Sequence, residues 1–162
     1  MNVVSIVRGA GYTAVILAML AIAGCAKQQP DQTASMAAAA PPGSQQDFVV
    51  NVGDRVFFDT DSSELSEQAR ATLDKQAQWL NLYNRYAFTI EGHADERGTR
   101  EYNIALGARR AQTVREYLVS RGVSAQRMRT ISYGKERPVA VCDDISCWSQ
   151  NRRAVTVLDQ SS

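Results

Sequence analysis

Residues 89–110 read TIEGHADERGTREYNIALGARR, and the rest of the chain can be placed outward from this stretch. Phe88, Ile90 and Gly92 alternate with polar residues, which is the period of a half-buried β-strand. Residues 94–98 break this alternation with a short polar segment that contains a glycine. A strand followed by a turn is therefore expected here.

A helix is expected to follow the turn. Thr99 is a favourable N-cap residue, and Glu101 places an acid in the first turn, where the helix dipole favours it. Arg121 supplies a basic last turn, and Gly122 suits the position that follows a helix C-cap. The stretch thus predicts a strand, a turn and a long helix.

Spacings of three and four residues divide this helix into two faces. The face expected to pack on the sheet carries Ile104, Ala108, Ala111, Val114 and Leu118. The second face carries Thr99, Asn103, Leu106 and Arg110. It begins at the turn with Asp95 and Arg97, so an acid, two arginines and a helix N-terminus should share one pocket. Such a pocket suits a zwitterion, because an acid can bind ammonium and an arginine can bind carboxylate.

The remaining elements follow from local patterns. A helix is expected from Ser66 onward, with Ala69, Leu73, Ala77 and Leu80 on its apolar face. Further strands are expected at residues 55–58, 128–133 and 154–158, and a short helical turn at 148–152. The order β-α-β-α-β-β predicts an α/β (α+β) two-layer sandwich with two main helices on a mixed sheet.

Four segments together resemble one known family. They are EGHADERGTREYNIALGARRA at 91–111, VFFDTDSSEL at 56–65, SYGKERP at 132–138 and NRRAV at 151–155. In these segments the chain is similar to OmpA-like peptidoglycan-binding domains, and most of all to the peptidoglycan-associated lipoproteins. Four motifs in the family's order are far more specific than one short motif. Arg100 stands where the family commonly has proline, which the first helical position does not require.

The resemblance implies a binding domain that is not an enzyme and needs no cofactor or metal. Its ligand would be the diaminopimelate of the peptidoglycan stem peptide, bound by Asp61, Asp95, Arg97, Thr99, Leu106 and Arg110. Asp95 would bind the ammonium, and Arg110 with the backbone near Thr99 the carboxylate. Arg97 would add a second charged contact, and Leu106 would pack on the aliphatic stem.

The resemblance also implies partners and a location. The protein would be an outer-membrane lipoprotein facing the periplasm, where it links the membrane to the cell wall for envelope integrity and cell division. Its protein partners would be the Tol proteins, in particular the β-propeller protein TolB. An OmpA-like anchor outside the Tol system is the alternative.

The N-terminal segment has the form of a lipoprotein signal peptide. Residues 1–24 carry one charge, Arg8, before an apolar run at 14–23 that is too short to span a bilayer. Small residues precede Cys25, as in a lipobox, so cleavage before Cys25 and lipidation of this cysteine are expected. An ordinary signal peptide with an incidental cysteine is the alternative.

A flexible linker is expected at residues 25–46, because residues 27–46 are rich in Gln, Ala, Pro, Ser and Gly. The folded domain is expected at 47–162. Without residues 1–24 the chain has 17 basic residues (18 less Arg8) and 17 acidic residues, since that segment carries no acid. This balance gives no sign of nucleic-acid binding.

Cys142 and Cys147 are expected to form a disulfide if the domain lies in an oxidising periplasm. A metal site or two free thiols are the alternatives, and a zinc site is disfavoured because His93 is the one histidine.

His93 also permits an enzyme interpretation, a periplasmic hydrolase in which it acts with Asp95 and Glu96. No serine or cysteine nucleophile has an assigned base, so the sequence favours His93 as a residue whose ring hydrogen-bonds locally and orients the turn. Simpler roles exist for the site residues too. Asp95 can cap a turn, Arg110 can be an exposed helix residue, and Asp61 can serve the loop alone.

Overall fold

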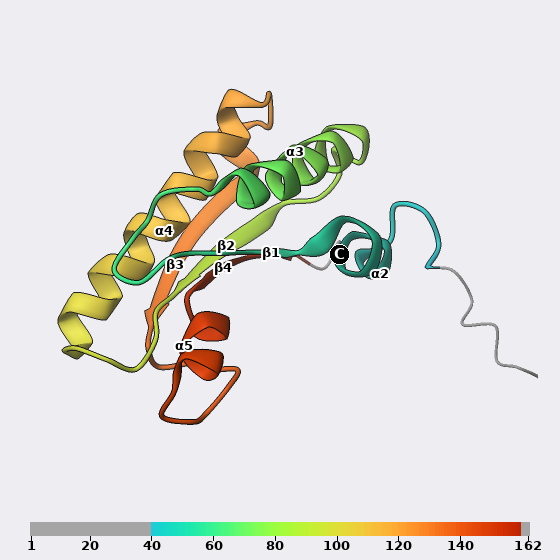
Figure 1. The fold of residues 1–162 in the computed structure, drawn as a ribbon. Helices are drawn as coiled ribbons and strands as arrows, with labels where there is room; N and C mark the ends of the chain where they lie inside the picture. The colour runs from blue at the N-terminus through green and yellow to red at the C-terminus, as the bar shows by residue number, and fades with distance from the viewer. Residues whose placement is uncertain (1–39, 160–162) are drawn as a thin grey trace, which may run out of the picture. The chain divides into compact units, whose positions relative to one another are not determined.

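The structure is a computed structural model that describes residues 40–159 (Figure 1). The predicted signal peptide, Cys25 and most of the predicted linker fall outside these residues. Residues 40–162 form a compact unit of their own. Between residues 40 and 159, no helix has both the length and the apolar composition needed to cross a membrane.

Four strands form one mixed sheet in the order β1-β4-β2-β3 (Figure 1). They are β1 (Arg55–Phe57), β2 (Phe88–His93), β3 (Met128–Gly134) and β4 (Arg153–Leu158). Strand β4 runs antiparallel to β1 and β2, whereas β2 and β3 are parallel. The predicted two-layer fold with a mixed sheet is therefore confirmed.

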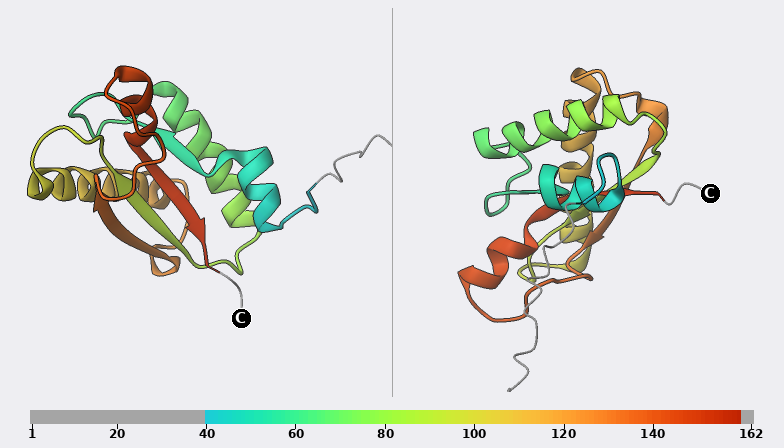
Figure 2. Two further views of the ribbon diagram at one scale, coloured as in Figure 1. Left: turned by 90° about the horizontal axis from the view of Figure 1, so that it is seen from below. Right: turned by 90° about the vertical axis from the view of Figure 1, so that its right-hand side faces the viewer.

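Two long helices pack on the sheet and enclose the core with it (Figures 1 and 2). They are α3 (Glu67–Leu82) and α4 (Arg100–Ser120). Ser66 caps α3 by accepting from the amide of Ala69, and Thr99 caps α4 by accepting from that of Tyr102. The core includes Leu73, Ala77, Leu80, Phe88, Ile90, Ala111, Val114 and Leu118. Two short helices precede β3 and β4, η2 (Ala125–Arg127) and α5 (Ile145–Asn151).

The folded domain begins before Asp47, the predicted boundary. The short helix α2 (Gln45–Asp47) leads directly into a π-helical turn, η1 (Phe48–Gly53). The Phe48 ring is buried with its centroid 4.9 Å from that of Trp79, and the Gly43 carbonyl accepts from the Tyr86 hydroxyl at 2.8 Å. The last residues of the predicted linker thus bond to the connection between α3 and β2.

Helix α4 packs so closely on β2 that the backbone of Gly107 contacts the backbone of Gly92. A Cβ atom on Gly107 would lie 2.8 Å from the Gly92 oxygen, closer than side chains tolerate. The predicted core face of this helix is partly wrong, because Ala108 is exposed and Ile104 is only half buried. The physical reason is that Gly107, which has no side chain, makes the closest contact with the sheet. The next residue, Ala108, therefore points away from the sheet.

Candidate ligand-binding site

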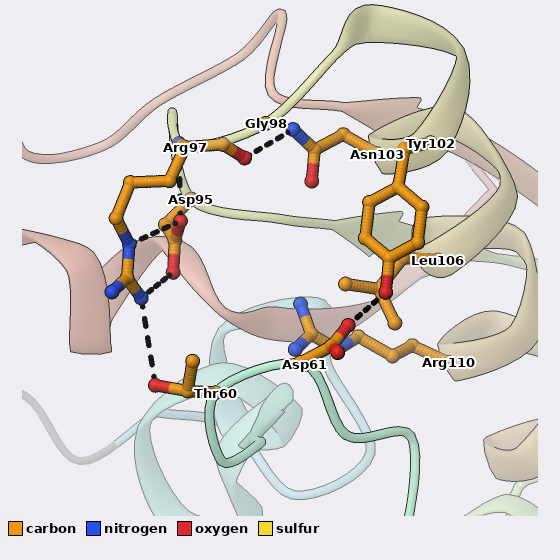
Figure 3. Close-up of a pocket in the computed structure, with 9 residues that line it drawn as sticks. All are labelled: Thr60, Asp61, Asp95, Arg97, Gly98, Tyr102, Asn103, Leu106 and Arg110. Carbon is orange, nitrogen blue, oxygen red and sulfur yellow. Dashed lines mark hydrogen bonds and ion pairs between the residues drawn. The ribbon is translucent and has the colours of Figure 1, made fainter.

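A pocket of about 240 Å³ opens where the β1–α3 connection, the β2–α4 turn and the first half of α4 meet (Figure 3). It is lined by Thr60, Asp61, Asp95, Arg97, Gly98, Tyr102, Asn103, Leu106 and Arg110. Five of the six predicted ligand contacts are therefore brought together here. The sixth, Thr99, does not line the pocket, because its hydroxyl caps helix α4.

Arg110 is completely buried, at 0% exposure, and holds three backbone segments together. Its Nε donates to the Ser62 carbonyl at 2.8 Å, Nη1 to that of His93 at 2.8 Å, and Nη2 to that of Asp59 at 3.0 Å. A guanidinium has five N–H groups, so two have no protein partner among residues 40–159. Burial and the nearby Arg152 lower the pKa of Arg110 to about 10, so it remains charged at neutral pH.

The Asp95 carboxylate is held by two arginines. Arg97 donates to Oδ1 from its amide at 3.2 Å and its Nε at 3.1 Å, and to Oδ2 from Nη2 at 2.7 Å. Arg152 Nη1 donates to Oδ2 at 3.4 Å. Burial by itself would raise the pKa of Asp95, but the bonds from Arg97 and Arg152 lower it overall. Asp95 is thus ionised, and its roughly four acceptor positions are occupied.

Asp61 presents the second acid of the pocket. Its backbone is left-handed, with φ of 57°, a conformation that aspartate and asparagine adopt more readily than most residues. The hydroxyl of Tyr102 donates to its Oδ1 (Figure 3), and this bond raises the pKa of Tyr102. Within residues 40–159 no arginine or lysine forms an ion pair with Asp61. Its negative charge is therefore open to a cationic ligand.

The turn between β2 and α4 is fixed by hydrogen bonds from Lys135, which lies outside the pocket lining, and from Asn103, which is part of it. Lys135 Nζ donates to the carbonyls of Glu96 at 3.0 Å and Gly98 at 2.7 Å. Asn103 Nδ2 donates to the Arg97 carbonyl at 2.8 Å. These bonds hold the start of α4 beside the pocket, where the positive end of the helix dipole favours an anion.

Helix α5 supports the turn through Trp148. The Arg97 guanidinium lies 4.2 Å from the centre of the Trp148 ring, and the indole N–H donates to Glu96 Oε1 at 2.9 Å. The disulfide between Cys142 and Cys147 bridges the start of this helix, with the two Cα atoms 5.7 Å apart. The predicted cysteine pair thus lies next to the residue that contacts Arg97.

The sequence pattern does not single out Thr60, Gly98 or Tyr102 as pocket residues, whereas Asn103 lies on the helix face that is expected to border the pocket. For Tyr102 a signal exists, since it lies four residues before Leu106 on the same helix face. A structural pairing of both arginines in the NRRAV motif with acids is also expected from the sequence. Arg152 does pair with Asp95, but Arg153 donates to the carbonyls of Asn151 and Arg137 instead.

His93 does not line the pocket, and the prediction that its ring orients the turn by hydrogen bonding is wrong. The ring is 2% exposed and packs against Tyr133, with centroids 5.6 Å apart. Neither ring nitrogen has a hydrogen-bond partner in the described part of the chain. Only the His93 backbone oxygen takes part in the site, as an acceptor for Arg110. The ring is therefore not placed to act as a base in this pocket.

The environment of His93 predicts a pH-dependent stability. Burial, together with Arg153, Arg137 and Arg55, lowers its pKa from 6.5 to about 4. The ring is thus neutral at pH 7, and its 3.6 Å contact with Glu91 is not an ion pair there. The unfolded chain takes up this proton near pH 6.5 and the folded chain only near pH 4. We therefore expect the free energy of unfolding to decrease by about 3 kcal/mol between pH 7 and pH 4 from this group.

Urea unfolding of residues 40–162 across this pH range measures the effect. Other acids also titrate between pH 7 and pH 4, and a His93→Gln variant keeps their contribution. The free energy of unfolding of this variant should therefore decrease by about 3 kcal/mol less than that of the wild type over this range. Parallel profiles for the two proteins would contradict the account.

Comparison with known proteins shows the family of the chain. Residues 57–152 match the model of the OmpA family. The chain belongs to the OmpA family. The family member from Rhizobium meliloti (strain 1021), a peptidoglycan-associated lipoprotein, is 72% identical over 144 residues, which cover 86% of this chain and 82% of the relative. The peptidoglycan-associated lipoprotein of Mesorhizobium japonicum is 68% identical over 148 residues, which cover 88% of each chain.

Two solved structures show the same fold. The peptidoglycan-associated lipoprotein from Burkholderia pseudomallei is 44% identical, with a TM-score of 0.64 over 65% of this chain and 90% of that chain. The C-terminal domain of Helicobacter pylori MotB is 21% identical, with a TM-score of 0.63 over 67% of this chain and 86% of that one. The MotB likeness concerns the fold alone.

Proposed function

We propose that this protein is a lipoprotein that binds peptidoglycan non-covalently through the diaminopimelate of the stem peptide. The observation that carries the proposal is a pocket lined both by the exposed acid Asp61 and by the buried Arg110, which has two N–H groups without a partner among residues 40–159 (Figure 3). Diaminopimelate is an amino acid whose side chain ends in a second ammonium and carboxylate pair. A pocket that offers both charges next to each other matches that end group.

The carboxylate of this end group would bind Arg110 and the start of α4. The position is desolvated, so the charge-assisted bonds formed there are stronger than on the surface. Leu106, which is buried in the pocket wall, would contact the aliphatic stem of the ligand. These assignments keep the roles expected from the sequence for both residues.

The ammonium group needs an acceptor that is not already saturated. The four acceptor positions of Asp95 are filled by Arg97 and Arg152, whereas the Asp61 side chain accepts one bond within residues 40–159, from Tyr102. We therefore assign the first ammonium contact to Asp61. Asp95 would also bind the ammonium when the half-exposed Arg97 side chain moves away from its carboxylate. In the free protein, Arg97 occupies the position that the ligand cation would take.

Lysine-containing stem peptides should be rejected by the same pocket. Lysine has the ammonium group but lacks the second carboxylate, so Arg110 would be covered by the ligand without a partner for its two remaining N–H groups. A lysine peptide would therefore gain the contact between its ammonium and the acid, but Arg110 would be desolvated without a carboxylate to bind.

The remainder of the proposal concerns the envelope. Lipidation at Cys25 would anchor the protein in the outer membrane, with the domain in the periplasm linking membrane and wall for envelope integrity and cell division. This is supported by the lipobox-like sequence before Cys25 and by relatives named as lipoproteins. Association with the Tol proteins, TolB in particular, rests on the family resemblance alone.

Co-sedimentation of residues 40–162 with purified peptidoglycan sacculi tests the function. The fragment should pellet with sacculi. Asp61→Asn should weaken the affinity for sacculi at least about tenfold, because it removes the charge that faces the ammonium. Asparagine tolerates the left-handed backbone at this position, so the fold is kept.

Asp74→Asn is the matched control, because Asp74 is an acid of α3 that pairs with Arg121 and does not line the pocket. Equal retention of the wild type and both variants would show that the pocket does not hold the wall.

A further inference from the structure

A second groove, of about 500 Å³, lies beside the candidate pocket between the β1–α3 connection and helix α5. These two segments lie side by side in both views of the domain (Figure 2). The groove is lined by Phe57, Phe58, Asp59, Glu64, Ser66, Gln68, Ser149, Gln150 and Arg152. None of these residues lines the candidate pocket.

Arg152 forms the boundary between the groove and the pocket. Its side chain is buried, with 7% of the residue exposed, and its Nη1 bonds to Asp95 of the pocket. Its Nε donates to the Phe58 carbonyl at 3.0 Å, which fixes the guanidinium against β1. Its Nη2 has no hydrogen-bond partner within residues 40–159, and Arg152 lines the groove. The groove therefore contains a rigidly held donor that lacks an acceptor.

The rest of the lining indicates what kind of ligand supplies that acceptor. Phe57 is 49% exposed and lines the groove, so an apolar side chain is available there to a ligand. Around it the groove is lined by two amides, two hydroxyls and two carboxylates, from Gln68, Gln150, Ser66, Ser149, Asp59 and Glu64. The Ser66 hydroxyl caps α3, and the Ser149 hydroxyl and the Gln150 amide donate to the Ser146 carbonyl, so the carboxylates and the Gln68 amide remain for a ligand. With one arginine against two acids, the net charge is −1, which disfavours a polyanion. A neutral ligand with many hydroxyl groups and an apolar face fits this mixture.

We propose that this groove binds an amino sugar of the glycan strand to which the stem peptide is attached. The acetamido or hydroxyl oxygens would accept from Arg152, the sugar hydroxyls would donate to Asp59 or Glu64, and one face of the ring would pack on Phe57. This inference rests on the proposed function, because it places the sugar next to the peptide pocket. A few peptide residues span roughly 10 Å at most, so a sugar linked to a bound diaminopimelate stays within reach of a neighbouring groove.

Calorimetric titration of residues 40–162 with two ligands tests this assignment. One ligand is a diaminopimelate-containing tripeptide, and the other is the same tripeptide attached to its disaccharide. The disaccharide form should bind about tenfold more tightly. Phe57→Ala should remove this difference and leave the affinity for the tripeptide unchanged, since Phe57 does not line the pocket. Val157→Ala is the control, because Val157 is similarly exposed, at 40%, and does not line the groove.

The two ligands separate failure of this inference from failure of the proposed function. Equal affinity for both ligands overturns the sugar site while the peptide pocket stands. This is also the result expected if the groove holds an extended peptide along the free edge of β1. Loss of tripeptide binding in Phe57→Ala would likewise overturn the assignment. If the tripeptide does not bind to the wild type at all, the proposed function itself fails.

Discussion

Replacing Arg110 with methionine is expected to abolish binding of the diaminopimelate peptide and to lower the free energy of unfolding by at least about 3 kcal/mol. Methionine has a similar length but no donor, so the carbonyls of Asp59, Ser62 and His93 lose the bonds that Arg110 makes to them. Each of these hydrogen bonds comes from a charged donor, and the loss of such a bond costs about 1 kcal/mol or more. Urea unfolding and calorimetry on residues 40–162 measure both effects.

A lysine at this position separates binding from folding. Arg110→Lys keeps the charge, but an ammonium group cannot reproduce the planar fork that reaches three carbonyls and a ligand together. We expect this variant to fold and to bind at least about tenfold more weakly. Arg70→Met is the control, because Arg70 is an exposed arginine of α3 that does not line the pocket. An Arg110→Lys variant with wild-type affinity would remove Arg110 from the site.

Replacing Gly107 with alanine is expected to destabilise the domain by about 2 to 4 kcal/mol. In most helix interiors this change stabilises by up to about 1 kcal/mol, because alanine has the higher helix propensity. Here the new methyl group would meet the backbone of Gly92 and the hydroxyl of Ser132, so α4 has to move away from β2. Thermal and urea unfolding give the sign as well as the size of the change.

The neighbouring position supplies the control for this prediction. Ala108 is exposed on the same helix, so Ala108→Gly should cost only the propensity difference, about 1 kcal/mol. A Gly107→Ala protein that is more stable than the wild type would show that the close contact between α4 and β2 does not determine the packing. Because α4 carries Arg110, movement of this helix should also weaken ligand binding.

Local patterns were sufficient to predict most of the fold. The strand before the turn, the cap at Thr99 and the end of the helix near Arg121 depend on neighbours in sequence, and the structure has all three. The shared helix face of Leu106 and Arg110 follows from the period of 3.6 residues in the same way. Elements of this kind are specified by residues a few positions apart.

Contacts between distant segments were not accessible to that reasoning. Arg152 reaches Asp95 across 57 positions of sequence, and it is this bond that completes the saturation of the carboxylate. The neutral, unpartnered ring of His93 depends on arginines contributed by three other segments. The choice of Gly107 over Ala108 as the buried position depends on the approach of β2. Tertiary packing decides each of these features.

The most direct test of the pocket is a calorimetric titration of residues 40–162 with two stem tripeptides that differ only in diaminopimelate or lysine at the third position. Saturable binding of the diaminopimelate peptide is predicted, with affinity for the lysine peptide lower by roughly 100-fold or more, because only the first offers a carboxylate to Arg110. Equal affinity for the two peptides, or no binding of either by the folded domain, would contradict the central claim.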